Sequence, residues 1–232
     1  MPYRRLPKTD AARIKALKTL LDNNDIYTAR NRFIDWKSIN KAKPAYDRLL
    51  TAHQQYRLCV GEQKRHTTRL AKLQHYATMY LSHFIQVLLM SVERGEIKRQ
   101  TLELYGLPDN ASSLPNIKSA EGVMEWMPKI IEGEKKRVRT GGRPIYNPTI
   151  GMISTHYDIF KNAYSQQQTL VKCTQMAQKD IVKMRPEVDE ILLELWNQIE
   201  KHFEKEPPET RFDACRKFGI VYYYRRHEEH IY

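Results

Sequence analysis

The chain has few cysteines and few glycines. The first shortage argues against disulfides and zinc sites, and the second favours helical structure. Its 232 residues include three cysteines, Cys59, Cys173 and Cys215, which lie far apart and form no Cys-x-x-Cys pair. An odd number of scattered cysteines argues against a disulfide framework and against a cysteine-based zinc site. Only nine glycines are present. Together with abundant Leu, Lys, Arg, Gln, Glu and Ala, this composition favours helix.

Signals for export and for common enzyme classes are also missing. The first residues, MPYRRLPKTDAARIKAL, lack the apolar stretch of a signal peptide. The chain contains no Gly-x-Ser-x-Gly, no phosphate-loop motif, no His-Glu-x-x-His and no Glu-x-x-His. We therefore expect a cytoplasmic protein that binds no cofactor or metal, and we lean against an enzyme. Because catalytic groups can converge from distant positions, the question of an enzyme stays open at this point.

The densest apolar run, residues 75–92, has about the length of a membrane span. It nevertheless contains His75, Ser82, His83 and Gln86, whose polar side chains are costly in hydrocarbon. Its apolar side chains recur at helical spacing and form a wide stripe: Ala77, Leu81, Phe84 and Leu88, flanked by Tyr80, Ile85, Leu89 and Val92. We expect a core helix buried by several neighbours and no membrane span.

Two long heptad-like patterns determine the expected fold. One covers about 45–94 and is opened by Pro44, and the other covers about 149–205. Gly61 is the weak point of the first helix, which we expect to be continuous, whereas Pro186 either kinks the second or begins a new one. We predict one all-α domain, an elongated helical bundle built on two long antiparallel helices with shorter helices alongside.

The remaining segments read as short helices and loops. Residues 1–43 hold a helix capped by Thr9 and a second helix over about 26–38. The insert 95–148 holds short helices near 97–106 and 119–136.

The last segment, 206–232, reads as a C-terminal tail with a helix over 209–217. Residues 218–224 are the best strand candidate. With no obvious partner strand, we expect them to pack as an extended tail.

Positive charge is concentrated in two places. Residues 1–72 carry 17 Lys and Arg against 6 Asp and Glu, which is +11 of the chain's net +12, and a basic loop is expected over 135–143. Such asymmetry can mark a surface for nucleic acid or anionic membrane. It can also be a solvated face, or one that pairs with acidic helices elsewhere in the fold, and we favour this second interpretation.

A thin basic arm over about 57–72 and the loop at 135–143 supply the candidate contacts for an anion or a nucleic acid. In the loop, the Gly141–Gly142 amides and arginine side chains could hold a phosphate, or the loop could be a mere connection. The candidate residues are Lys64, Arg65, Arg69, Lys72, Lys135, Lys136, Arg137, Arg139 and Arg143.

Two weaker patterns lie near the C-terminus. His227-Glu228-Glu229-His230 could bind a metal, but a solvated chain end is the favoured interpretation. Residues 222–226, YYYRR, could stack nucleic-acid bases, although we expect them to dock the tail on the bundle.

Several segments resemble a family of uncharacterised bacterial proteins, typical of gut Bacteroidetes. They are RRLPKTDAARIKAL (4–17), RQTLELYGLP (99–108), GGRPIYNPT (141–149), RPEVDEILLELWNQIEKHF (185–203) and RKFGIVY (216–222). The resemblance implies a bacterial origin and a single helical architecture, and it gives no site residues.

The leading functional hypothesis is a non-enzymatic structural or interaction bundle that binds a protein, either a second copy or another chain. The alternative is non-specific binding of nucleic acid through residues 1–72 and 135–143. A metal-dependent enzyme within the bundle is the third.

Overall fold

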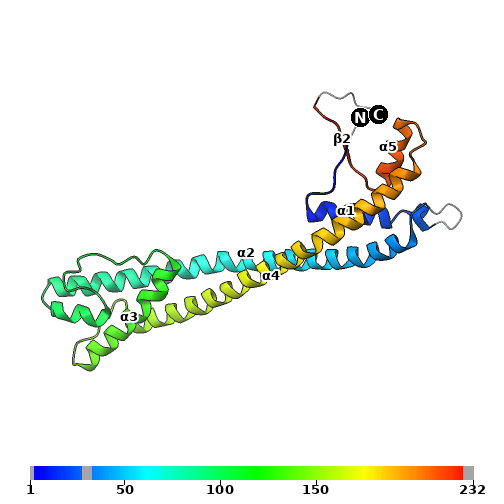
Figure 1. Ribbon diagram of the computed structural model, residues 1–232. Coiled ribbons are helices and arrows are strands. Elements are labelled where there is room, and N and C mark those ends of the chain that lie inside the picture. The colour runs from blue at the N-terminus through cyan, green and yellow to red at the C-terminus, as the bar shows by residue number, and fades with distance from the viewer. Residues whose placement is uncertain (1–2, 28–32, 227–232) are drawn as a thin grey trace. The chain divides into compact units, whose positions relative to one another are not determined.

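The computed structural model describes residues 3–27 and 33–226. Two long helices dominate this part of the chain: α2, Trp36–Glu93, and α4, Ile150–His202 (Figure 1). Ser38 of α2 contacts Glu194 of α4, whereas Cys59 contacts Cys173, so the two helices run antiparallel. The predicted all-α bundle, with two long helices and shorter helices packed with them, is confirmed.

Helix α2 begins earlier than predicted. It starts at Trp36 rather than near residue 45, and Pro44 lies inside it. The predicted helix over 26–38 is wrong for residues 26–27, which belong to the 3-10 helix η1 (Asn24–Tyr27), and for residues 33–35, which are not helical; residues 36–38 are helical but belong to α2. The apolar pattern explains the early start, because four side chains at helical spacing are buried before position 50: Ile39, Ala42, Ala45 and Leu49.

Both long helices continue through the residue at which a break or kink was considered, Gly61 in α2 and Pro186 in α4. Helix α2 is continuous through Gly61, as predicted, and α4 is continuous through Pro186. A proline inside a helix removes one backbone hydrogen bond. Burial of Ile181 and Val188 on either side of Pro186 offsets that cost.

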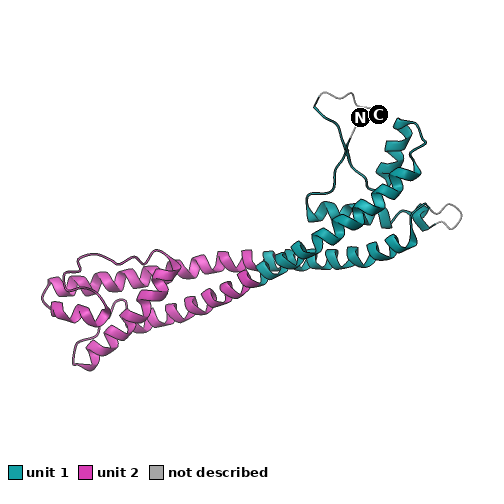
Figure 2. Cartoon of the chain, in the orientation of Figure 1, with its two compact units in different colours: residues 1–60, 173–232 teal, residues 61–172 magenta. Residues whose placement is uncertain are grey.

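The chain divides into two compact units (Figure 2). Unit 1 contains residues 1–60 and 173–232, and unit 2 contains residues 61–172. Helices α2 and α4 each contribute residues to both units. The single domain predicted over 1–232 stays a prediction.

Unit 1 is built on the two ends of the chain. Helix α1, Asp10–Leu21, begins at Thr9, whose side chain accepts a hydrogen bond from the Ala12 amide as predicted. It packs on α2 and α4 together with α5, Pro208–Lys217, which confirms the helix predicted over 209–217. The core includes fully buried side chains from three helices: Leu17, Leu20, Leu49, Leu195 and Trp196.

The strand candidate at 218–224 does have a partner. Strand β2, Tyr222–Tyr223, pairs antiparallel with β1, Tyr3–Arg4, within unit 1. The expectation of an unpaired extended tail was therefore wrong. Its partner strand lies at the opposite end of the sequence, where no strand pattern was recognised.

Unit 2 contains the wide stripe of α2. The stripe residues from Ala77 to Val92, of which Tyr80 is only partly buried, pack against η3 (Arg99–Tyr105), α3 (Ala120–Arg139) and the start of α4. The predicted helix near 97–106 is thus a 3-10 helix, and it ends at Gly106 with a φ of 70°. Ser119 caps α3 by accepting a hydrogen bond from the Gly122 amide.

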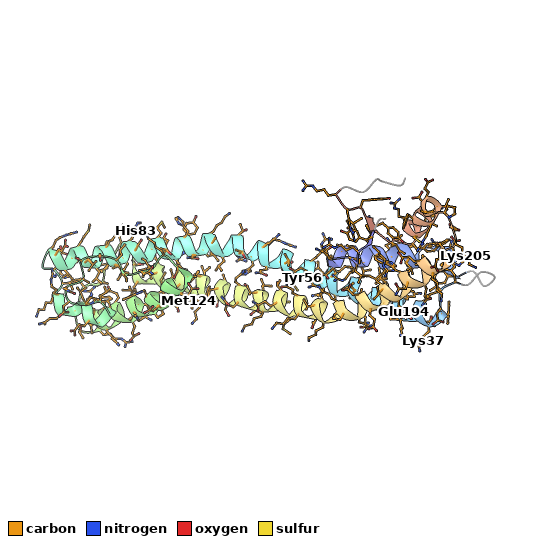
Figure 3. All side chains as sticks on the ribbon, turned by 45° about the horizontal axis from the view of Figure 1, so that its top comes forward. Lys37, Tyr56, His83, Met124, Glu194 and Lys205 are labelled. Atoms are coloured by element: carbon orange, nitrogen blue, oxygen red, sulfur yellow. The ribbon has the colours of Figure 1, made fainter. Side chains whose placement is uncertain are left out.

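A stretch of unit 2 without buried side chains lies next to this core. The basic arm predicted over about 57–72 lies mostly in this stretch. From here on, the arm means residues 61–76 of α2 and 164–172 of α4, and none of their side chains is buried. Side chains of both helices project outward along it (Figure 3). Its seam is partly polar, since the His66 ring lies 3.0 Å from Gln166 Oε1 and 3.2 Å from Gln167 Oε1.

None of the helices in the described residues is both long enough and apolar enough to cross a membrane.

Candidate functional site

A buried ionic cluster in unit 2 organises the candidate site. Three side chains form it, and we call them the Glu134 network: Tyr105, Glu134 and Arg137. The Arg137 guanidinium donates to both Glu134 carboxylate oxygens, at 2.9 Å and 2.8 Å, and to the Tyr105 hydroxyl at 2.8 Å. Tyr105 in turn donates to Glu134. Because the Glu134 and Arg137 side chains are only 1% and 6% exposed, this pair is shielded from water.

Close packing brings η3 onto α3 at this point. A side chain at Gly133 would place its Cβ 2.6 Å from Tyr105 Cδ1 and 2.7 Å from the Leu104 carbonyl oxygen. Real Cβ atoms do not approach other atoms so closely. Gly133 therefore permits the contact through which the Tyr105 hydroxyl reaches Glu134.

The same network ties down the loop after α3. Arg137 Nη2 donates to the Arg143 carbonyl at 2.7 Å, and the Ile145 amide donates to Glu134 Oε1 at 3.0 Å. The loop is thus held at two points by charged groups of α3. Hydrogen bonds to charged groups are stronger than those between neutral groups, so the loop has a defined conformation.

The network fixes the ionisation of its members. Burial raises the pKa of Glu134, but hydrogen bonds from Arg137, Tyr105 and the Ile145 amide outweigh burial, and the net pKa lies below its ordinary value. Burial and the hydrogen bond to Glu134 raise the pKa of Tyr105 well above its ordinary value. Burial lowers the pKa of Arg137, but its contacts with Glu134 and Tyr105 together raise it by more, and the net pKa lies above its ordinary value. The cluster is accordingly an ion pair with a neutral phenol at neutral pH.

A cavity of about 990 Å³ lies beside this loop, between the end of α2, η3 and residues 140–147, and we call it the unit 2 cavity. Its cationic side chains are Arg94, Lys98 and Arg143, together with the engaged Arg137. Arg94 has an acidic neighbour, Glu96, at 3.6 Å. Within the described residues, no acidic group lies within ion-pair distance of Lys98 or Arg143.

Apolar groups make up much of the remaining cavity lining. Val87, Ile97, Leu104 and Ile145 contribute, and Tyr146 stands at the edge with 76% of its surface exposed. Arginine and tyrosine are enriched among the residues that dominate protein interfaces. The cavity therefore combines an apolar lining with cations suited to carboxylates.

The five cations predicted as contacts in the 135–143 segment lie in different surroundings in the structure. This segment is not a loop throughout, because α3 continues to Arg139. Lys135, Lys136 and Arg139 are exposed on that helix, and Lys136 lies 3.9 Å from Glu132. Of the five predicted cations, only Arg143 reaches the cavity with an unengaged side chain.

Two parts of the hypothesis that the 135–143 segment holds a phosphate are wrong. Arg137 is buried and bound to Glu134, so its guanidinium is not offered to an external phosphate. The Gly141 and Gly142 amides donate to the carbonyls of Val138 and Arg137 at 3.1 Å and 3.0 Å. These donors are already used by the turn that ends α3.

The predicted arm cations are exposed in unit 2. Lys64, Arg65, Arg69 and Lys72 all lie on the solvent side of α2. Arg65 is 3.3 Å from Glu62, whereas no acid of the described chain pairs with the other three.

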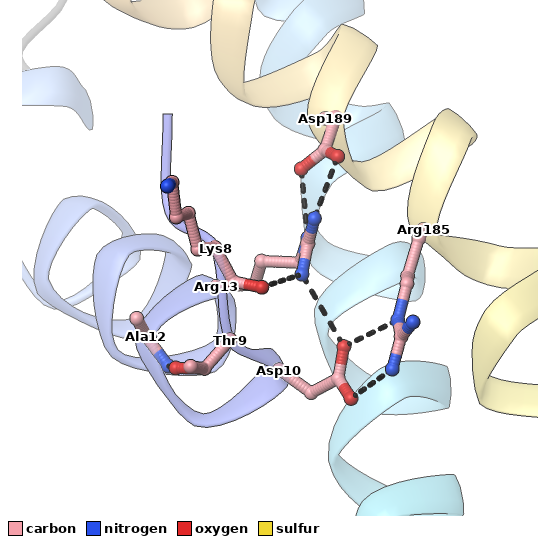
Figure 4. A network of polar contacts seen from close by, with 7 residues as sticks. All are labelled: Lys8, Thr9, Asp10, Ala12, Arg13, Arg185 and Asp189. Carbon is pink, nitrogen blue, oxygen red and sulfur yellow. Dashed lines mark hydrogen bonds and ion pairs between the residues drawn. The ribbon is translucent and has the colours of Figure 1, made fainter. Parts of the chain in front are cut away.

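Three of the remaining N-terminal cations are paired with acids of α4 within unit 1. Arg13 forms two 2.8 Å hydrogen bonds with Asp189, and Asp10 forms two 2.8 Å bonds with Arg185 (Figure 4). Two further pairs, Arg4 with Glu200 at 2.8 Å and Arg48 with Glu187 at 2.6 Å, follow the same pattern. For the three arginines the expectation of pairing with acidic helices holds, whereas Asp10 with Arg185 is the reverse arrangement, an N-terminal acid on a base of α4.

The weaker C-terminal candidates have different outcomes. His227 to His230 lie outside the described residues. Tyr222 donates to Glu200 at 2.6 Å and packs against Phe212, which agrees with the interpretation that this tail docks on the bundle. In the described part of the chain, no group of three or more His, Cys, Asp or Glu side chains could hold a metal ion.

Sequence reasoning missed Arg94, Lys98 and Tyr146. Arg94 and Lys98 precede the 135–143 segment by about 40 residues, and no charge cluster marks them. The signal that was available is the RPIY run at 143–146, which places an arginine and a tyrosine in one short loop.

Comparison of the chain with protein-family models, with curated proteins and with solved structures gives no match.

Proposed function

We propose that the protein is a non-enzymatic interaction protein, and that the unit 2 cavity binds an acidic segment of a partner protein that also carries apolar side chains. The observation that carries the proposal is the pairing of unengaged cations, Lys98 and Arg143, with an apolar lining and the exposed Tyr146. Carboxylates of the partner would meet the cations. Its apolar side chains would cover Val87, Ile97 and Leu104.

The fixed loop supports this proposal energetically. Ordering a mobile loop on binding costs free energy that is subtracted from the affinity. Here the Glu134 network holds Arg143 and Ile145 through backbone hydrogen bonds before any partner arrives. Binding would therefore require little reorganisation of the cavity.

Selection from a displayed library of random peptides tests the proposal. Immobilised protein should enrich peptides that combine Asp or Glu with aromatic or aliphatic residues. Replacing the two unengaged cations, Lys98→Glu with Arg143→Glu, should weaken a selected peptide by about tenfold or more, because reversed charges repel its carboxylates. Fluorescence anisotropy of the labelled peptide measures the change.

A matched charge reversal on the arm provides the control. Lys64→Glu with Arg69→Glu changes the net charge of the chain by the same amount, and it should leave peptide affinity unchanged at constant ionic strength. Equal weakening by both double variants would indicate a general charge effect and contradict the proposal. Enrichment of peptides without acidic residues would contradict it as well.

A second candidate function is non-specific binding of a nucleic-acid backbone along the arm. The supporting observation is that Lys64, Arg69 and Lys72 are exposed and have no acidic partner in the described chain. Such binding should fall steeply with salt, by an amount set by the number of phosphates neutralised. Filter binding at low salt tests it. Retention of DNA or RNA that survives in the Lys64→Glu/Arg69→Glu variant would contradict the assignment to the arm.

A further inference from the structure

Two cysteines on different helices lie in direct contact within unit 1. Cys59 of α2 and Cys173 of α4 place their sulfur atoms 3.0 Å apart, although 114 positions separate them in the chain. Both are free thiols. The third cysteine, Cys215, is buried in α5 and packs within the unit 1 core. The contact therefore singles out one pair from the three cysteines.

We propose that Cys59 and Cys173 form a reversible disulfide, with a small-molecule disulfide such as glutathione disulfide as the oxidant. A disulfide needs the two sulfurs about 2.05 Å apart, so each has to move by roughly half an ångström. Side-chain rotation suffices for a shift of that size. The two helices already hold the sulfurs together and therefore need not rearrange.

Exposure determines the order of the two steps. Cys173 is exposed and Cys59 is buried, so Cys173 meets the oxidant. Its thiolate attacks one sulfur of glutathione disulfide, forms a mixed disulfide and releases one glutathione thiolate. The Cys59 thiolate then attacks the Cys173 sulfur and releases the second. In total, two protein thiols and one glutathione disulfide become one protein disulfide and two glutathione thiols.

The surroundings of the pair set the pH dependence. The hydrogen bond with Cys59 raises the pKa of Cys173, with burial adding to the effect, so the thiol form dominates at neutral pH. The Gln55 side-chain amide donates to the Cys59 sulfur at 3.7 Å. No Lys, Arg or His contact with either sulfur is present among the described residues. Disulfide formation should accordingly accelerate as pH rises, because the thiolate is the nucleophile.

The position of the pair gives the disulfide a structural consequence. Unit 2 consists of residues 61–172, and Cys59 and Cys173 enclose this whole span. The disulfide would close the span into a covalent loop. Local opening between α2 and α4 next to the pair would then be restrained, whereas in the reduced protein only non-covalent contacts oppose it.

Mass spectrometry of the full chain in a glutathione redox buffer tests the proposal. We expect the intact mass to fall by the mass of two hydrogen atoms. Digestion should then yield a peptide cross-linked between Cys59 and Cys173, and a reductant should restore the starting mass in full. Hydrogen exchange of amides near 55–63 and 170–177 should slow severalfold on oxidation. Cys215→Ser should behave like the wild type, since Cys215 takes no part.

Variants of the pair decide the assignment. Cys173→Ser should abolish the mass loss, and Cys59→Ala, which keeps the buried site apolar, should stop the reaction at a glutathione adduct on Cys173. A wild-type protein that accumulates this adduct without the cross-link would overturn the proposal. So would a disulfide that involves Cys215 or joins two chains through Cys173.

Discussion

Removing the arginine of the Glu134 network should destabilise unit 2 locally. Arg137→Met deletes four hydrogen bonds between 2.7 Å and 2.9 Å and leaves the Glu134 carboxylate buried without its cation. Breaking a buried ion pair in this way costs about 3–5 kcal/mol. The lower end applies here, because Tyr105 and the Ile145 amide still donate to Glu134.

Native-state hydrogen exchange measures this cost where it arises. A loss of about 3 kcal/mol raises the local opening constant roughly a hundredfold, since each 1.4 kcal/mol corresponds to a factor of ten. The increase should appear in peptides covering 99–107 and 134–147, which the network joins. Amides of α1 and α5 in unit 1 should keep their wild-type exchange rates.

Two further variants separate the ion pair from simple loss of side-chain volume. Arg139→Met lies two residues along the same helix, and as an exposed position it should change stability by less than about 0.5 kcal/mol. Glu134→Gln combined with Arg137→Met removes both charges and should cost less than the sum of the single changes. Arg137→Met with no larger effect than Arg139→Met would refute the reasoning.

Two other predictions concern glycine and pH. Gly133→Ala should destabilise unit 2 by about 1–3 kcal/mol, because the added Cβ would lie 2.6 Å from Tyr105 Cδ1. Gly61→Ala should instead stabilise helix α2 by about 0.5–1 kcal/mol, because a Cβ there has no atom within 4 Å. Urea unfolding followed by circular dichroism checks both signs, and equal signs would contradict this account. The hydrogen bond to Arg185 lowers the pKa of Asp10 below 3.8, so its contribution to stability is complete above that value and is lost as pH falls through the lower folded-state pKa. Asp10→Asn should therefore lower the unfolding free energy at pH 7 and lose less on acidification, and an unchanged acid profile would contradict the assignment.

Local signals in the sequence were sufficient for the helices and their caps. The spacing alone predicts the stripe from Ala77 to Val92, and its members are buried in unit 2 except Tyr80, which is partly buried. Thr9 accepts the hydrogen bond predicted for a helix cap. These features depend on residues only a few positions apart, which is why the sequence shows them directly.

Long-range effects explain the errors in the fold. Pro44 locally favours the start of a helix, because proline fits the first turn. Burial of Ile39 and Ala42 against the rest of unit 1 extends the helix past that local preference. Likewise, the pairing of Tyr3 with Tyr223 joins two short segments from opposite ends of the chain. Two residues on each side are too few to produce a strand pattern.

The candidate site was recognised only in part for the same reason. Glu134 and Arg137 are three positions apart on α3, a spacing that favours an ion pair, but nothing in the sequence shows that this pair is buried. Its burial depends on Tyr105, which lies 29 residues earlier and reaches the pair over Gly133. One of the predicted phosphate ligands is consequently a structural residue.

Photochemical cross-linking tests the proposed function most directly. A selected acidic peptide carrying a photoreactive group is irradiated with the protein, and the attachment sites are located by mass spectrometry. We predict adducts within residues 94–104 and 140–147, the segments that supply most of the lining of the unit 2 cavity, and their loss in the Lys98→Glu/Arg143→Glu variant. Adducts concentrated on residues 61–72 of the arm, or spread over the chain in proportion to exposure, would contradict the proposal.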